Sequence, residues 1–116
     1  MALTVGIDIG STTVKLVVLD GEHILYTHYE RHLSQVRQKA VELLREARDV
    51  LGGQAFTLAI SGSGGLGVAK SCNIPFVQEV FATLKAVPLF GDGIDLVIEL
   101  GGEDAKILFR TGGVEE

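Results

Sequence analysis

Apolar and polar residues alternate along the first thirty positions of the chain, and this period of two predicts β-strands. The alternation is regular over residues 4–9, and a nearly unbroken aliphatic run over 14–19 is typical of a central strand. Asp20-Gly21 is a two-residue hairpin signal, so we expect an antiparallel third strand over 24–29. Its polar alternates, such as His28, favour a half-exposed position at the edge of the sheet.

A helical period then replaces the alternation. Apolar residues recur at helical spacing over 34–51 and charged residues fill the opposite face, which predicts an amphipathic helix. Ser34 is the expected N-cap of this helix. Gly52-Gly53 is expected to end it in the left-handed region of backbone conformation.

Short strands and helices alternate in the second half of the chain. In chain order the predicted elements are a strand over 55–61, a helix over 66–71, a short strand over 74–78, a helix over 79–90, and two strands over 94–100 and 105–110. Pro88 should end or kink the second of these helices, and residues 91–93 are the best linker candidate. We therefore expect a first domain over residues 1–93 and, over 94–116, a hairpin that begins a second domain, because a strand pair alone is marginally stable in water.

Composition and charge narrow the classes of function. The chain has 116 residues, of which 47% are hydrophobic and 22% charged, as expected of one small folded core. Ten basic against fifteen acidic residues give a net charge of −5 without a basic stripe, which disfavours nucleic acids and anionic membranes as partners. No apolar run approaches the about 20 residues of a membrane span, and no secretory signal is present, so we expect a cytoplasmic protein.

Cysteine and glycine contents add two constraints. The single cysteine, Cys72, excludes an internal disulfide and a four-cysteine metal site within one chain, and we expect it to pack as a small apolar residue. Glycine, at 15 residues, is about twice as frequent as usual and occurs in clusters. Such clusters predict turns at which the backbone comes close to another group.

The first glycine-containing loop carries the residues of a phosphate site. The residues that would form it are Asp8, Gly10, Ser11, Thr12, Thr13 and, two positions on, Lys15. Glycine lets backbone N–H groups approach a phosphate, and hydroxyls add donors. Asp8, at the end of the first strand, would hold Mg²⁺ through water, and Lys15 would reach the same phosphates from the face that Thr13 shares. The alternative is an ordinary hairpin turn with a solvated lysine.

A second loop repeats the pattern of an acid, one spacer and a glycine. It consists of Glu99, Leu100, Gly101, Gly102, Glu103 and Asp104, and it also follows an apolar strand. Alone it is compatible with a simple glycine-rich hairpin. Together the two loops would clamp the phosphates and the metal of a nucleotide from opposite sides of a cleft, with Glu99 as a second metal ligand.

Four segments together resemble a known superfamily: GIDIGSTTVKLVVLD, ISGSGGLGVAK, VQEVFATLKA and DLVIELGGEDAKILF. They are similar to the ATPases of the acetate kinase, sugar kinase, chaperone and actin superfamily. More narrowly, they resemble the activators of 2-hydroxyacyl-CoA dehydratases and benzoyl-CoA reductases, in particular the long multidomain branch. The resemblance extends from Leu3 to about Val114.

The resemblance implies two ribonuclease H-like domains, each a mixed sheet with helices on both faces, with ATP bound between them. It also implies a homodimer that holds a [4Fe-4S] cluster and uses ATP hydrolysis to drive a low-potential electron into a CoA-thioester dehydratase or reductase. Both loops would be the phosphate loops, although the superfamily usually has Asp where this chain has Glu99. The cluster cysteines and the adenine-binding half do not occur in these 116 residues, so we expect the chain to be the N-terminal piece of a longer protein.

Several residues keep two interpretations each. Gly62 and Gly64 would bind an anion at a helix start or allow close strand–helix packing. Glu79 would orient or deprotonate the attacking water, or simply complement a helix dipole. His28 and His32 lack a third metal ligand. A small-molecule kinase and an actin-like or chaperone-like nucleotide switch remain alternative functions.

Overall fold

A computed structural model describes residues 3–91, 93–100, 105–111 and 114–115. The chain divides into two compact units, Met1–Val77 and Gln78–Glu116. We predicted a domain boundary after residue 93. In this division, the helix over Glu79–Ala86 belongs to the same unit as the terminal hairpin. The domain organisation of the longer protein stays a prediction.

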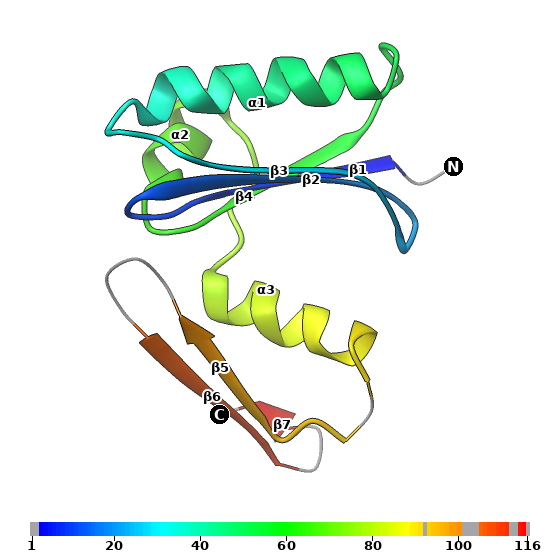
Figure 1. Ribbon diagram of the computed structural model, residues 1–116, viewed down its shortest axis with the longest axis vertical. Helices are drawn as coiled ribbons and strands as arrows, with labels where there is room; N and C mark the ends of the chain where they lie inside the picture. Colours follow the sequence, from blue (N-terminus) through cyan, green and yellow to red (C-terminus); the bar gives the residue numbers. More distant parts are fainter. Residues whose placement is uncertain (1–2, 92, 101–104, 112–113, 116) are drawn as a thin grey trace. The chain divides into compact units, whose positions relative to one another are not determined.

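Four strands form the sheet of the first unit (Figure 1). They are β1 (Leu3–Ile9), β2 (Thr13–Asp20), β3 (His23–Arg31) and β4 (Thr57–Ser61). In the order β3-β2-β1-β4, β2 is antiparallel to both β3 and β1, whereas β4 runs parallel to β1. The predicted mixed sheet is therefore confirmed. The turn between β2 and β3 is at Gly21-Glu22, one residue later than predicted.

Two helices of the first unit, α1 (Val36–Val50) and α2 (Gly65–Cys72), pack on the same face of this sheet (Figure 1). The buried side chains of this core come from alternate strand positions and from one stripe of each helix: Leu3, Val5, Ile7, Ile9, Val14, Leu16, Val18, Ala40, Leu43, Ala47, Leu51, Ile60 and Ala69. Period two in β1 and β2 therefore sends every second side chain into the core. The expected helix on the opposite face is not among the described residues of this unit.

The predicted C-terminal end of α1 is confirmed, whereas its predicted N-cap is wrong. Gly52 and Gly53 have φ of 61° and 81°, so the glycine end is confirmed. At the start, Gln35 and not Ser34 is the N-cap residue, and no side chain caps the helix. Ser34 has a φ of 64°, and its N–H donates to the His32 ring, so it cannot serve as the cap.

Two further predictions near α2 need correction. Residues 74–78 do not form a full strand, because only Phe76 bridges Ile60, in parallel orientation. Flanking backbone bonds from Ile60 N to Pro75 O and from Val77 N to Ile60 O support this single bridge. Cys72 is exposed at the end of α2 and is not packed in the core as expected.

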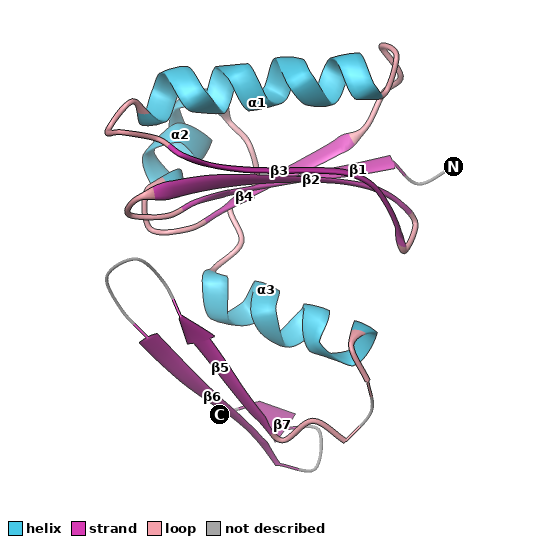
Figure 2. Cartoon of the chain, viewed as in Figure 1, coloured by secondary structure: helices cyan, strands magenta, loops and turns pink. Residues whose placement is uncertain are grey.

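The second unit consists of a helix and a small antiparallel sheet (Figure 2). Its elements are α3 (Glu79–Ala86), the 3₁₀ turn η1 (Val87–Leu89), β5 (Leu96–Leu100), β6 (Ala105–Thr111) and β7 (Val114–Glu115). Pro88 lies in the 3₁₀ turn and ends the helix as predicted. The short β7, which pairs with the end of β6, was not predicted. Within the part of the chain that the structure describes, no helix is long and apolar enough to cross a membrane.

Candidate functional site

Polar residues form a row across the face of the first sheet that lies opposite the helices. Asp8, Lys15 and Tyr29 are direct cross-strand neighbours on β1, β2 and β3. The Lys15 ammonium lies 3.2 Å from Asp8 Oδ2 and 5.6 Å from the centre of the Tyr29 ring. Both contacts hold the ammonium beside the end of β1. The ion pair between Asp8 and Lys15 was not predicted, and the roles of the two residues toward a ligand stay predictions.

The loop that joins β1 and β2 offers free backbone donors. Gly10 N–H donates to Thr13 O at 2.8 Å, which leaves Ser11 and Thr12 as the two turn residues. Among the described residues, no partner accepts from the N–H groups of Ser11 and Thr12. Two adjacent free N–H groups, the hydroxyls of the loop and one ammonium make a set of donors suited to an anion.

Asp8 also has an unsatisfied oxygen. Oδ1 is buried and accepts no hydrogen bond from any described residue, while Oδ2 is engaged by Lys15. A buried carboxylate oxygen without a donor is costly, so such an atom calls for a partner. Among the described residues, no three His, Cys, Asp or Glu side chains gather as a metal site. A nucleotide-bound Mg²⁺ needs only one or two carboxylates besides phosphates and water, and Asp8 fits that requirement.

Gly62 and Gly64 bring the end of β4 against the end of β1. A Cβ on Gly62 would lie 2.2 Å from Ile9 O and 2.4 Å from Asp8 Oδ1, and Gly62 has a φ of +96°. Gly64 N–H donates to Ile9 O at 2.8 Å. This N–H is therefore already used, and the geometry favours the close-packing interpretation of the two glycines. Their contact with a phosphate stays a prediction.

A buried histidine that the sequence did not single out for this site supports the loop. His32 Nε2 lies 3.0 Å from Gly10 O, and its backbone N–H donates to Thr12 O at 3.1 Å. From the sequence, His32 was a candidate only as a metal ligand. A shallow pocket of about 220 Å³ adjoins this contact, and its lining residues are Ser11, Thr12, Arg31, His32, Leu33 and Ser34.

The other predicted site residues belong to the second unit. Glu79 is the first residue of α3, where the helix dipole favours a carboxylate. Glu99, on β5, accepts a hydrogen bond from Thr83 Oγ1 at 3.0 Å. Their catalytic and metal-binding roles stay predictions. The remaining members of the second loop, Gly101, Gly102, Glu103 and Asp104, lie outside the described residues.

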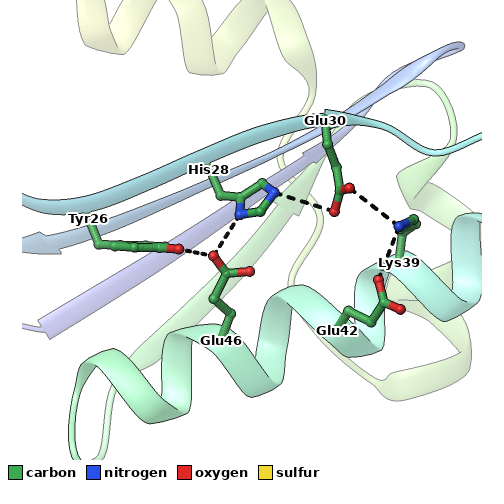
Figure 3. Close-up of polar contacts among 6 residues, drawn as sticks. All are labelled: Tyr26, His28, Glu30, Lys39, Glu42 and Glu46. Atoms are coloured by element: carbon green, nitrogen blue, oxygen red, sulfur yellow. Dashed lines mark hydrogen bonds and ion pairs between the residues drawn. The ribbon is translucent and has the colours of Figure 1, made fainter.

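A second polar cluster joins β3 to α1 (Figure 3). Tyr26 donates to Glu46 Oε1, and the same oxygen lies 2.6 Å from His28 Nδ1. Burial raises the pKa of Glu46, but the hydrogen bonds from Tyr26 and His28 and the charge of His28 lower it by more, so the net shift is downward. Bonding to the Glu46 carboxylate raises the pKa of Tyr26.

The cluster continues through ion pairs toward the start of the helix. His28 Nε2 lies 3.4 Å from Glu30, and Lys39 lies 3.3 Å from both Glu30 and Glu42. Hydrogen bonds to Glu42 and Glu30 raise the pKa of Lys39. The sequence predicted a half-exposed β3 but gave no sign of these pairings.

No protein-family model matches the sequence. The uncharacterized protein MJ0004 of Methanocaldococcus jannaschii is 31% identical to it over 107 residues, which are 91% of this chain and 42% of that protein. The chain thus spans less than half the length of this curated relative.

Solved structures match the chain over nearly its whole length. Component A of the (R)-2-hydroxyglutaryl-CoA dehydratase from Acidaminococcus fermentans gives a TM-score of 0.75 over 99% of this chain and 45% of that one, at 20% identity. The activator of the 2-hydroxyisocaproyl-CoA dehydratase from Clostridium difficile, with bound ADPNP, gives 0.70 over 94% and 41%, at 23% identity. A ROK family glucokinase from Streptomyces griseus, with glucose and AMPPNP, gives 0.67 over 99% and 46%, at 21% identity. The chain therefore has the actin-like ATPase fold of these proteins.

Proposed function

We propose that this chain is the first nucleotide-binding half of an ATPase, and that the loop between β1 and β2 binds the terminal phosphates of Mg·ATP. The observation that carries the proposal is the combination, at one sheet end, of two free N–H groups, the Lys15 ammonium and the unsatisfied Asp8 Oδ1. An anion would satisfy the N–H groups and the ammonium, and its metal would lie beside the Asp8 carboxylate. The ATP analogues bound in two of the similar structures support this reading.

The side chains of the site would act by positioning and by charge. The N–H groups of Ser11 and Thr12 would bind phosphate oxygens, and Lys15 would neutralise charge that develops on them. Asp8 would accept a hydrogen bond from a water of the Mg²⁺ shell. Glu79 would orient the attacking water, and the second loop would bind the phosphates from the other side.

For the longer protein we propose the role of an activator. It would couple ATP hydrolysis to electron transfer into a CoA-thioester dehydratase or reductase, as a homodimer with a [4Fe-4S] cluster. The resemblance of two dehydratase activators to this chain supports the proposal. Cys72 alone cannot supply four thiolates, so the cluster ligands would have to come from residues outside these 116.

A small-molecule kinase is the second candidate, because the glucokinase covers 99% of this chain with the same fold. The two candidates differ in a testable way. Anaerobic reconstitution of the longer protein with iron and sulfide would give a cluster in an activator and none in a kinase. Phosphorylation of a sugar or carboxylate without a cluster would overturn the activator role. Nucleotide-driven polymerisation without either activity would instead indicate an actin-like switch.

Phosphate binding by the chain itself is tested by titration. We expect the 116-residue chain to bind Mg·ATP weakly and to hydrolyse it negligibly, because the second half of the clamp is incomplete. Replacing Lys15 by Ala should weaken the binding by about tenfold or more, the loss expected for a charge-assisted contact. Isothermal titration calorimetry measures this.

Lys70→Ala is the matched control, because Lys70 is an exposed lysine on α2. It should leave the affinity unchanged. Equal losses in both variants would point to unspecific charge attraction, and clear turnover by the chain alone would contradict the need for a second half.

A further inference from the structure

The His32 side chain is buried although it is polar. It directly follows β3, is 5% exposed, and is the one polar or charged residue among the described residues that is buried. Both ring nitrogens are used. Nδ1 accepts from Ser34 N–H at 3.0 Å, and Nε2 lies 3.0 Å from Gly10 O. Because a backbone N–H can only donate and a carbonyl can only accept, the ring is neutral and carries its proton on Nε2.

His32 holds the β1–β2 loop at two points. Its ring donates to Gly10 O, and its backbone N–H donates to Thr12 O. The two carbonyls flank Ser11. In a planar trans peptide the C=O and the following N–H point in opposite directions, and no peptide bond between described residues is cis. Holding the Gly10 carbonyl toward His32 therefore turns the Ser11 N–H away from His32, where no described residue accepts from it.

The backbone around His32 is unusual in a way that supports a dedicated contact. Leu33 and Ser34, neither of which is glycine, have φ of 53° and 64°. Left-handed conformations cost free energy for such residues and persist only where surrounding bonds enforce them. The Ser34 N–H bond to Nδ1 is a bond of this kind. It also fixes the ring so that Nε2 faces Gly10.

We propose that His32 is a positioning residue for the phosphate loop. Its ring fixes the Gly10–Ser11 peptide so that the Ser11 N–H is directed at an anion before the anion binds. This role rests on the proposed phosphate binding of the loop. It requires no contact of His32 with the ligand, because the residue acts through the backbone of Gly10 and Thr12.

Two conservative variants separate the two ring contacts. In His32→Gln the side-chain amide reaches the place of Nε2 and keeps a donor for Gly10 O. In His32→Asn the shorter amide lies at the place of Nδ1 and loses that donor. Titration with Mg·ATP and with Mg·tripolyphosphate should show about fivefold to tenfold weaker binding for His32→Asn, the value of one lost hydrogen bond. His32→Gln should stay within about twofold of the unmodified chain.

Amide exchange reports the same effect without any ligand. In His32→Asn the Gly10 amide, which donates to Thr13 O across the turn, should exchange faster, whereas the core amides of Val5 and Ile7 should keep their rates. Equal affinities and equal exchange in both variants, with unchanged thermal unfolding, would overturn the proposal. So would equal loss of affinity in both variants while both stay folded.

The unmodified chain provides a test that needs no variant. Ring ¹⁵N spectra at neutral pH should show a protonated Nε2 and a bare Nδ1 for His32. The opposite tautomer or a doubly protonated ring would overturn the inferred contact, even if both variants fail to fold. If the unmodified chain bound neither Mg·ATP nor Mg·tripolyphosphate, the proposed function would be rejected. The ring spectrum and the amide exchange would still decide whether His32 donates to Gly10 O.

Discussion

Gly62 shows how strongly the candidate site depends on the absence of a side chain. Its hypothetical Cβ would overlap the Ile9 carbonyl and the Asp8 carboxylate, and its backbone is in a conformation that favours glycine. Close contact with Gly62 helps to bury Asp8 Oδ1. A larger residue would have to displace either the backbone of β1 or the carboxylate itself.

Replacing Gly62 by Ala should therefore destabilise the chain by at least about 2 kcal/mol, from steric overlap and backbone strain together. Urea unfolding measures the loss. Gly53→Ala is the matched control, because Gly53 has a φ of +81° but no atom within 4 Å of its Cβ position. It should cost only about 1 kcal/mol. Similar losses for the two variants would show that the close approach at Gly62 has no energetic effect.

Some site residues could be predicted from the sequence and others could not. Alternation in β2 was enough to place Thr13 and Lys15 on one face, because the period of a strand is fixed by its backbone. The register that sets Lys15 opposite Asp8 came only from the structure. The contact of His32 with Gly10 spans 22 positions and depends on the β3–α1 turn, so no local pattern reveals it. Sequence spacing suggested only the pair His28 and His32, whose side chains take part in separate contacts.

At the scale of elements, the contact between β3 and α1 is largely polar. Tyr26, His28 and Glu30 alternate along the edge strand and meet Glu46 and Lys39 of the helix (Figure 3). Apolar residues fix the centre of the sheet, whereas this cluster fixes the edge strand against the helix. Because the cluster consists of titratable side chains, its contribution to stability depends on pH.

Glu46 gives the sign of that dependence at low pH. Its pKa is lowered in the fold, so its contribution to stability is present above the ordinary glutamate pKa of about 4 and is lost as the pH falls through the lowered value. We expect the difference in unfolding free energy between the unmodified chain and Glu46→Gln to be larger at neutral pH than near pH 3. Urea titrations across that range measure it.

Glu42→Gln is the control for this series, since Glu42 pairs with Lys39 and is more exposed than Glu46. It should change the acid limb of the profile less than Glu46→Gln. Parallel acid profiles for Glu46→Gln and the unmodified chain would rule out the role given to Glu46.

Tyr26 acts at the other end of the pH range. Its raised pKa stabilises the fold below about pH 10, and this contribution is lost as the pH rises further.

Elements were predicted well where periodicity is strong and poorly where tertiary contacts decide. The strands β1 and β2 and the helix α1 lie within about two residues of their predicted limits, as is usual for element ends. Residues 74–78 have strand-like composition, but only Phe76 reaches a partner strand. Ser34 has the chemistry of an N-cap, yet the His32 ring holds its N–H and turns its backbone away from the helix.

At the scale of the whole molecule, the second unit has an exposed apolar face. Leu96, Ile98 and Leu100 alternate along β5, and Ile107 lies opposite Ile98 on β6. These four side chains are between 49% and 78% exposed. A contiguous set of exposed aliphatic residues on a small sheet favours association with another surface.

We therefore expect the 116-residue chain to associate with itself at high concentration, and Ile98→Lys to reduce this association. Light scattering over a concentration series measures the mass. Ile24→Lys is the control, because Ile24 is 67% exposed on β3 and belongs to the first unit, not to this apolar face. A monomer at every concentration would refute the expectation, and equal effects of the two variants would mean that added charge alone prevents association.

The two-residue turn between β1 and β2 limits how this chain can change in length. Gly10 pairs with Thr13, and this spacing is what sets Lys15 opposite Asp8 and Val14 in the core. Insertion or deletion of one residue would exchange the two sides of β2 and drive the ammonium among the aliphatic side chains. Homologous chains should therefore differ in this turn by even numbers of residues or not at all.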